Sequence, residues 1–166
     1  MIPQIYKIDT IGLGTLYAMA KPSAEWLKDD IEYLNFINVN LVVSLLEKKE
    51  ESDLGLTMEQ EIIMKAGMGF ISHEIADRGL PSEPSFKKLV ESLYLKLNQG
   101  ESVAIHCRAG IGRTGVLASC LLIRNGVNPE MAIEQVSTAR GVKIPDTREQ
   151  VRFIHHFSKI HNIISI

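Results

Sequence analysis

The chain has 166 residues, of which 45% are hydrophobic and 23% are charged, a balance that suits one globular domain over residues 1–166 and excludes a disordered chain. Its net charge of −2 argues against nucleic acid as a partner. No apolar run approaches the roughly 18 residues that span a bilayer, and the cysteines and histidines lack zinc-ligand spacing. We therefore expect a cytoplasmic protein with no membrane association, metal or cofactor.

Apolar runs alternate with helical patterns along the chain. In order, they predict strands at 5–8 and 14–17, a helix over 23–37, a strand at 39–45, a helix over 57–67, a strand at 70–75, a helix over 84–98, a strand at 102–106, and helices over 113–124, from 128 onward and over 146–161. Three helix starts depend on capping signals: Ser23, Thr57 with Gln60, and Asp146 with Glu149. The charged stretch 47–53 is expected to be a solvated loop.

This alternation predicts an α/β domain with a mostly parallel central sheet of about four to five strands, flanked by helices. In such sheets, ligands bind beyond the carboxyl ends of the strands. The charge is uneven, since residues 1–100 carry 10 Lys and Arg against 15 Asp and Glu, whereas residues 101–166 carry 8 against 5. The basic part also holds both cysteines, so we expect the chemistry to follow the strand at 102–106.

The segment after that strand reads HCRAGIGRTG over residues 106–115. Gly110 and Gly112 allow a tight turn that points backbone N–H groups into one hollow, and the helix start adds the positive end of its dipole. Arg113 adds a charged fork that can bind two anion oxygens. A thiolate at Cys107, at the base of this loop, would be stabilised by the same groups.

Two further side chains in the segment could assist. The Thr114 hydroxyl could donate a hydrogen bond to the sulfur, and the His106 ring could hold the loop through its nitrogens. Taken singly, a buried cysteine is usually a small hydrophobic residue, and a glycine-rich turn is often only a turn. The combination at fixed offsets favours an anion pocket with a nucleophile at its floor.

The pattern His-Cys-x-x-Gly-x-Gly-Arg-Thr-Gly resembles the signature loop of the cysteine-dependent protein tyrosine phosphatases. The small size is similar to compact atypical members of the dual-specificity branch, and the resemblance extends over roughly residues 20–160. It implies that Cys107 is the nucleophile, that Arg113 binds phosphate and that Thr114 assists departure of the thiolate. It also implies a cradle of backbone amides from Arg108, Ala109, Gly110, Ile111, Gly112 and Arg113.

This family supplies a proton donor from a mobile loop about thirty residues before the cysteine. Asp77, in the sequence IADRGLP, lies 30 residues upstream of Cys107 on a loop with glycine and proline, so we predict that it is the general acid. The alternative is an ordinary turn aspartate. The rival acids are Glu83 and Asp146, of which Asp146 is better explained as a helix cap.

Three other residues carry weaker expectations. Gln150 matches a family position that positions water in the second step, but it could instead cap back to Thr147. Arg140 matches an arginine that recurs before the last helix, where it either braces the signature loop or caps a helix C-terminus. Cys120 lies about 10 Å along the helix from Arg113, so we expect it to pack in the core.

These residues predict a monomeric protein phosphatase that acts on phosphotyrosine, and also on phosphoserine and phosphothreonine, through a cysteinyl-phosphate intermediate. A phosphorylated protein or peptide is the expected partner. The first alternative is a phosphatase of a phosphoinositide, nucleotide or RNA 5′-phosphate, which the charge of Arg108 favours and the neutral Ile111 disfavours. The second is a phospho-binding module without turnover, which should lack the nucleophile, the arginine or the acid.

Overall fold

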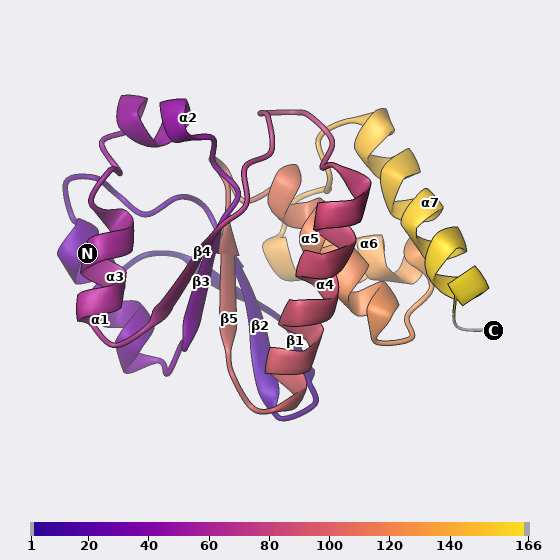
Figure 1. The fold of residues 1–166 in the computed structure, drawn as a ribbon, viewed down its shortest axis with the longest axis horizontal. Helices are drawn as coiled ribbons and strands as arrows, with labels where there is room; N and C mark the ends of the chain where they lie inside the picture. Colours follow the sequence, from indigo (N-terminus) through magenta and orange to yellow (C-terminus); the bar gives the residue numbers. More distant parts are fainter. Residues whose placement is uncertain (1, 165–166) are drawn as a thin grey trace.

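A five-stranded sheet runs through the centre of the computed structural model, which describes residues 2–164 (Figure 1). The strands are β1 (Ile5–Ile11), β2 (Gly14–Met19), β3 (Leu41–Ser44), β4 (Gly69–Ser72) and β5 (Val103–His106). The helices are α1 (Leu27–Phe36), α2 (Lys48–Asp53), α3 (Glu59–Lys65), α4 (Glu83–Asn98), α5 (Arg113–Arg124), α6 (Pro129–Arg140) and α7 (Arg148–Ile164). Within the described part of the chain, no helix combines the length and apolar character needed to span a membrane.

The sheet has the strand order β1-β2-β5-β3-β4. Only the β1–β2 pair is antiparallel, whereas β2, β5, β3 and β4 pair in parallel. The predicted mostly parallel sheet is therefore confirmed. The register pairs His106 with Met19 on one side and with Ser44 on the other, so three strand ends meet where the HCRAGIGRTG segment begins.

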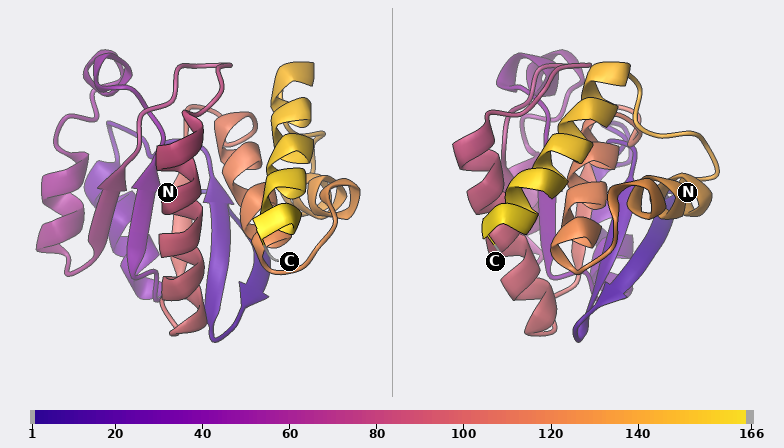
Figure 2. Two further views of the ribbon diagram at one scale, coloured as in Figure 1. Left: turned by 45° about the vertical axis from the view of Figure 1, so that its right-hand side comes forward. Right: turned by 90° about the vertical axis from the view of Figure 1, so that its right-hand side faces the viewer.

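Side-chain alternation along the strands divides the core between the two faces of the sheet. Val42 and Ala104 join the apolar cluster of α1 and α3, whereas Leu41, Val43 and Ile105 join the cluster of α4, α5, α6 and α7. Figures 1 and 2 show these two groups of helices on opposite sides of the sheet. Both faces are thus covered, which explains why the inner strands are almost continuously apolar.

The prediction of a solvated loop over 47–53 is wrong, because residues 48–53 form α2. A capping box starts this helix: the Glu47 side chain accepts from the backbone of Glu50, and the Glu50 carboxylate accepts from the Glu47 N–H at 3.1 Å. Glu50 is also only 7% exposed. A charged run therefore conceals one buried acid, whose partner lies elsewhere in the chain.

The capping signals of the N-terminal half were placed too early. Ser23 accepts a hydrogen bond from the Trp26 N–H at 3.3 Å, but α1 begins only after Trp26. The Thr57–Gln60 capping box is wrong, since α3 begins at Glu59 after Met58 and has no side-chain cap. In both places a turn precedes the helix, and a sequence pattern does not reveal that extra turn.

Candidate active site

The loop between β5 and α5 begins at Cys107, which is 3% exposed. Gly110 has a φ of +74°, and a Cβ there would lie 2.5 Å from the carbonyl oxygen of Met19. Glycine is therefore required for conformation and for the close approach of the strand end. The Lys21 N–H donates to the Arg108 carbonyl at 3.1 Å, which further fixes the loop against the segment after β2.

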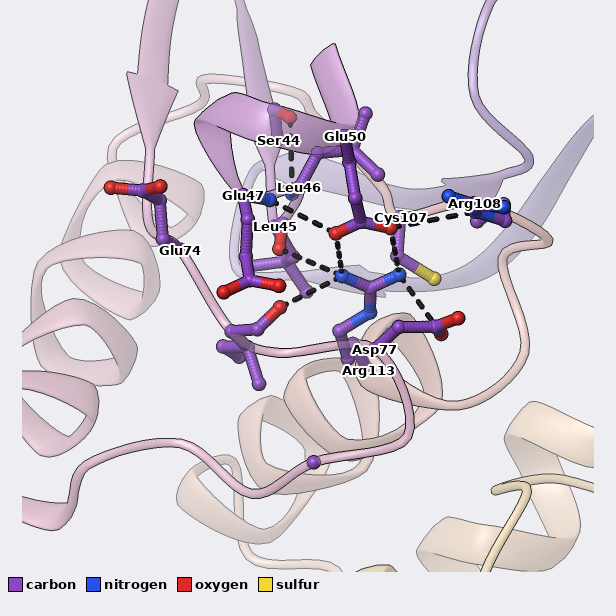
Figure 3. A network of polar contacts seen from close by, with 12 residues as sticks. Ser44, Leu45, Leu46, Glu47, Glu50, Glu74, Asp77, Cys107, Arg108 and Arg113 are labelled. Atoms are coloured by element: carbon purple, nitrogen blue, oxygen red, sulfur yellow. Dashed lines mark hydrogen bonds and ion pairs between the residues drawn. The ribbon is translucent and has the colours of Figure 1, made fainter. Parts of the chain in front are cut away.

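Arg113 opens α5 and is 2% exposed. Its Nη1 and Nη2 donate to the two carboxylate oxygens of Glu50 at 2.6 and 3.0 Å (Figure 3). Nη1 also donates to the carbonyls of Ile75 at 2.8 Å and Leu45 at 3.4 Å. This bidentate pair fixes the plane of the guanidinium, and Glu50 is a residue of the site that the sequence does not reveal.

Electrostatics favour the charged forms of this pair. Burial alone would raise the pKa of Glu50 and lower that of Arg113, but their hydrogen bonds and mutual attraction outweigh it. The pKa of Glu50 is thus below its ordinary value, and the pKa of Arg113 is above its own. Glu50 also lies 3.4 Å from the Nε of Arg108, so one carboxylate organises two guanidinium groups around Cys107.

Asp77 reaches the same guanidinium from the opposite side. Its Oδ1 accepts from Arg113 Nη2 at 3.1 Å, and its side chain is 52% exposed. The next residue, Arg78, has a φ of +60°, a conformation that is uncommon outside glycine. The turn directs the Asp77 carboxylate toward Arg113 and the sulfur of Cys107 (Figure 3). The structure therefore brings the predicted acid, arginine and nucleophile together.

Gln150 is fully buried and joins α7 to the loop between β4 and α4 that carries Asp77 (the acid loop). Its Nε2 donates to the Gly79 carbonyl at 3.2 Å, while its Oε1 accepts from the N–H groups of Asp146 and Thr147 at 3.0 and 3.1 Å. Its own N–H donates to the Thr147 Oγ1 at 3.1 Å. The capping alternative is confirmed, and the Asp146–Glu149 box is wrong because the cap lies one residue later.

The two rival acids occupy different places. Glu83 lies 2.6 Å from the Nε2 of His156, on the surface between α4 and α7. The Asp146 carboxylate lies against Gly112, where any Cβ would collide with it. Asp146 is thus beside the loop rather than on a helix cap, but the contact with the Arg113 guanidinium belongs to Asp77.

Arg140 braces the loop between β5 and α5, which is one of the two alternatives that the sequence offers for it. Its Nε donates to the Gly110 carbonyl at 2.9 Å and its Nη2 to the Ala109 carbonyl at 3.0 Å. Its guanidinium lies 4.1 Å from the ring centroid of Tyr6. Because Arg140 occupies these two carbonyls, the amides are the backbone groups of the loop that can bind an anion.

Thr114 and Cys120 are both buried in α5, but only Thr114 carries a buried hydroxyl group. The Thr114 Oγ1 has no hydrogen-bond partner among residues 2–164, and a buried hydroxyl without a partner is costly unless a ligand or intermediate supplies one. Cys120 is fully buried in the core, as expected, and burial raises its pKa well above the ordinary value. Cys107, in contrast, begins the loop that leads to Arg113.

His106 precedes the nucleophile and is fully buried. Its Nδ1 lies 3.2 Å from the Cys107 carbonyl oxygen, and its Nε2 lies 2.5 Å from the Oε2 of Glu59 on α3. The expectation that the ring holds the loop through its nitrogens agrees with these contacts. The sequence does not distinguish Glu59 from an ordinary acid in the first turn of a helix.

Comparisons with known proteins agree with this arrangement. The family model described as "Polymorphic toxin system, DSP-PTPase phosphatase" matches residues 17–127. The chain is 31% identical over 165 residues to the protein tyrosine phosphatase domain-containing protein 1 of Mus musculus. This match covers 90% of this chain and 22% of that protein. It is 27% identical over 133 residues to the cyclin-dependent kinase inhibitor 3 of Homo sapiens, and this match covers 79% of this chain and 63% of that protein.

The chain therefore spans about a fifth of the first relative and less than two thirds of the second. Among solved structures, kinase associated phosphatase with its catalytic-site cysteine replaced by serine has a TM-score of 0.88 and 22% identity, covering 98% of this chain and 97% of the other. PTPMT1 in complex with PI(5)P has a TM-score of 0.81 and 22% identity, covering 98% and 99%. This chain belongs to the DSP-PTPase family of cysteine-dependent phosphatases.

Proposed function

We propose that this chain hydrolyses phosphotyrosine in proteins, and phosphoserine and phosphothreonine more slowly, through a cysteinyl-phosphate intermediate. The observation that carries the proposal is the burial of the two reactive groups: Cys107 is 3% exposed and Arg113 is 2% exposed. A phosphate on a long, flat phenol ring reaches such a floor, whereas a phosphate on a short serine side chain reaches it less readily. The neutral Ile111 beside the loop also suits an apolar ring.

In the first step, the Cys107 thiolate attacks phosphorus, so that a P–S bond forms while the bond to the phenol oxygen breaks. The phosphoryl oxygens are held by the loop amides and by Arg113. Entry of the phosphate displaces Asp77 from Nη2, to which it is joined at 3.1 Å. The freed Asp77 carboxylate takes up a proton from water and, as the carboxylic acid, gives this proton to the leaving oxygen.

In the second step, water attacks phosphorus and the P–S bond breaks. Asp77, now a carboxylate, accepts a proton from the water, and inorganic phosphate leaves. The returning thiolate accepts a hydrogen bond from the Thr114 hydroxyl, which has no other partner in the described chain. Gln150 is engaged with the backbone of the acid loop and of its own helix, so it supports Asp77 rather than binding the water.

A phosphoinositide is the second candidate substrate, and one observation favours it. Arg108 is half exposed at the loop, where its charge suits a second phosphate. One solved neighbour is PTPMT1 in complex with PI(5)P. The chain is also 33% identical over 84 residues to an Arabidopsis thaliana protein named as a phosphatidylinositol 3,4,5-trisphosphate 3-phosphatase and protein-tyrosine-phosphatase.

The test is phosphate release, in the presence of a chelator, from phosphotyrosine, phosphoserine and phosphothreonine peptides and from phosphoinositides in parallel. Cys107→Ser should abolish release, whereas Cys120→Ala, a matched cysteine control in the core, should not. A higher kcat/KM for phosphotyrosine peptides supports the proposal. Faster release from a lipid, or release that survives Cys107→Ser, contradicts it.

A further inference from the structure

Two ionisable side chains are buried together directly behind the nucleophile. Glu59, at the start of α3, is 1% exposed, and His106, at the end of β5, is 0% exposed. Their Oε2 and Nε2 atoms lie 2.5 Å apart, and the second carboxylate oxygen of Glu59 has no hydrogen-bond partner within residues 2–164. A buried acid with one unpartnered oxygen is expensive to retain, which points to a role beyond packing.

The contacts of the imidazole restrict where its protons lie. Nδ1 is 3.2 Å from the carbonyl oxygen of Cys107, which can only accept a hydrogen bond. Nδ1 must therefore carry a proton, since a bare nitrogen would face the carbonyl lone pairs. With Nδ1 engaged in this way, the Glu59 carboxylate is the group that contacts the other ring nitrogen, Nε2.

We propose that Glu59 is a positioning residue for Cys107 that acts through His106. Its carboxylate, 2.5 Å from Nε2, holds the ring so that Nδ1–H donates to the Cys107 carbonyl, and this contact fixes the backbone from which the sulfur enters the loop. This inference rests on the proposed reaction at Cys107. Glu51 on α2 is the charged group that interacts electrostatically with both Glu59 and His106, but the contact with the ring nitrogen is made by Glu59.

The experiment measures the rate at which iodoacetamide alkylates Cys107 as a function of pH, with the modified residue mapped by mass spectrometry. In Glu59→Gln, the pH of half-maximal rate should rise by about one unit, which slows alkylation about tenfold at lower pH. The acidic limb of kcat/KM for para-nitrophenyl phosphate should shift equally. Glu61→Gln, on the same helix and paired with Lys65 at the surface, is the control and should match the wild type.

A double-variant comparison separates this role from a general structural one. In a His106→Asn background, Glu59→Gln should cause no further shift, because the ring through which it acts is gone. Glu59→Asp, which keeps the carboxylate, should retain most of the wild-type midpoint and also serves if Glu59→Gln does not fold. An unchanged midpoint in Glu59→Gln, or the same shift with and without His106, overturns the inference. Alkylation needs no substrate, so failure of the proposed phosphatase function would be seen separately.

Discussion

Replacing Glu50 should damage both the fold and the reaction, because this acid holds Arg113 from behind. Removing one partner of a buried ion pair costs about 3–5 kcal/mol. The Glu50 side chain is 10% exposed and that of Arg113 is 1% exposed. Arg113 would keep its bonds to the Ile75 carbonyl and to Asp77, so we expect Glu50→Ala to cost about 3 kcal/mol, the low end of that range.

Such a loss corresponds to a fall of roughly 6–12 °C in Tm for a chain of this length. Glu50→Gln keeps an acceptor for one N–H group and should cost about half as much. The guanidinium would also lose its fixed plane, so kcat/KM for para-nitrophenyl phosphate should fall about 100-fold. Urea denaturation and steady-state kinetics measure the two effects.

Glu51→Ala, a neighbour on the same helix, is the matched control. Burial and repulsion from Glu59 raise the pKa of Glu51, so its removal should change the free energy of unfolding by less than about 0.5 kcal/mol. If Glu50→Ala were as stable and as active as Glu51→Ala, the bidentate pair would not be what fixes Arg113, and the reasoning would fail.

Three further predictions concern the same site. The pKa of Glu50 lies below its ordinary value of 4.5, so just below pH 4.5 the unfolded chain binds more protons than the folded chain. The free energy of unfolding should therefore fall as the pH drops below about 4.5. Urea denaturation should show a weaker fall in Glu50→Gln. Asp77→Asn should lower kcat about 100-fold for phenyl phosphate and much less for para-nitrophenyl phosphate. Asp146→Asn, the control, should not show this dependence on the leaving group. Equal losses of kcat with both esters would show that Asp77 is not the acid. Gln150→Ala frees the Gly79 carbonyl, so kcat should fall about tenfold with an unchanged Kd for vanadate; a weakened Kd alone would contradict this.

The catalytic loop could be predicted from sequence because all its chemistry lies within one strand, one loop and one helix start. Cys107, Arg113 and Thr114 are close in the chain, and the glycines between them report the turn directly. Asp77 could be predicted for a similar reason, since a fixed offset and a glycine-proline loop mark it.

Glu50 and Glu59 could not be predicted, because their roles depend on partners 63 and 47 residues away. In sequence, a buried acid looks the same as a solvated one until the partner is placed beside it. The caps at Thr57 and Asp146 failed for a more local reason: the residue types suit a helix start, but the neighbouring turn decides which residue occupies it. The fold class could still be predicted, because it depends on the alternation of apolar runs with helical patterns along the chain and not on the caps.

In the proposed reaction, the sulfur of Cys107 accepts the phosphoryl group. The most direct measurement is rapid acid quenching of the protein during turnover of a ³²P-labelled phosphotyrosine peptide, followed by mapping of the labelled residue. We expect ³²P label on Cys107 that appears and decays during turnover, and no labelled protein with Cys107→Ser. Turnover without a labelled protein, or label on any other residue, would contradict it.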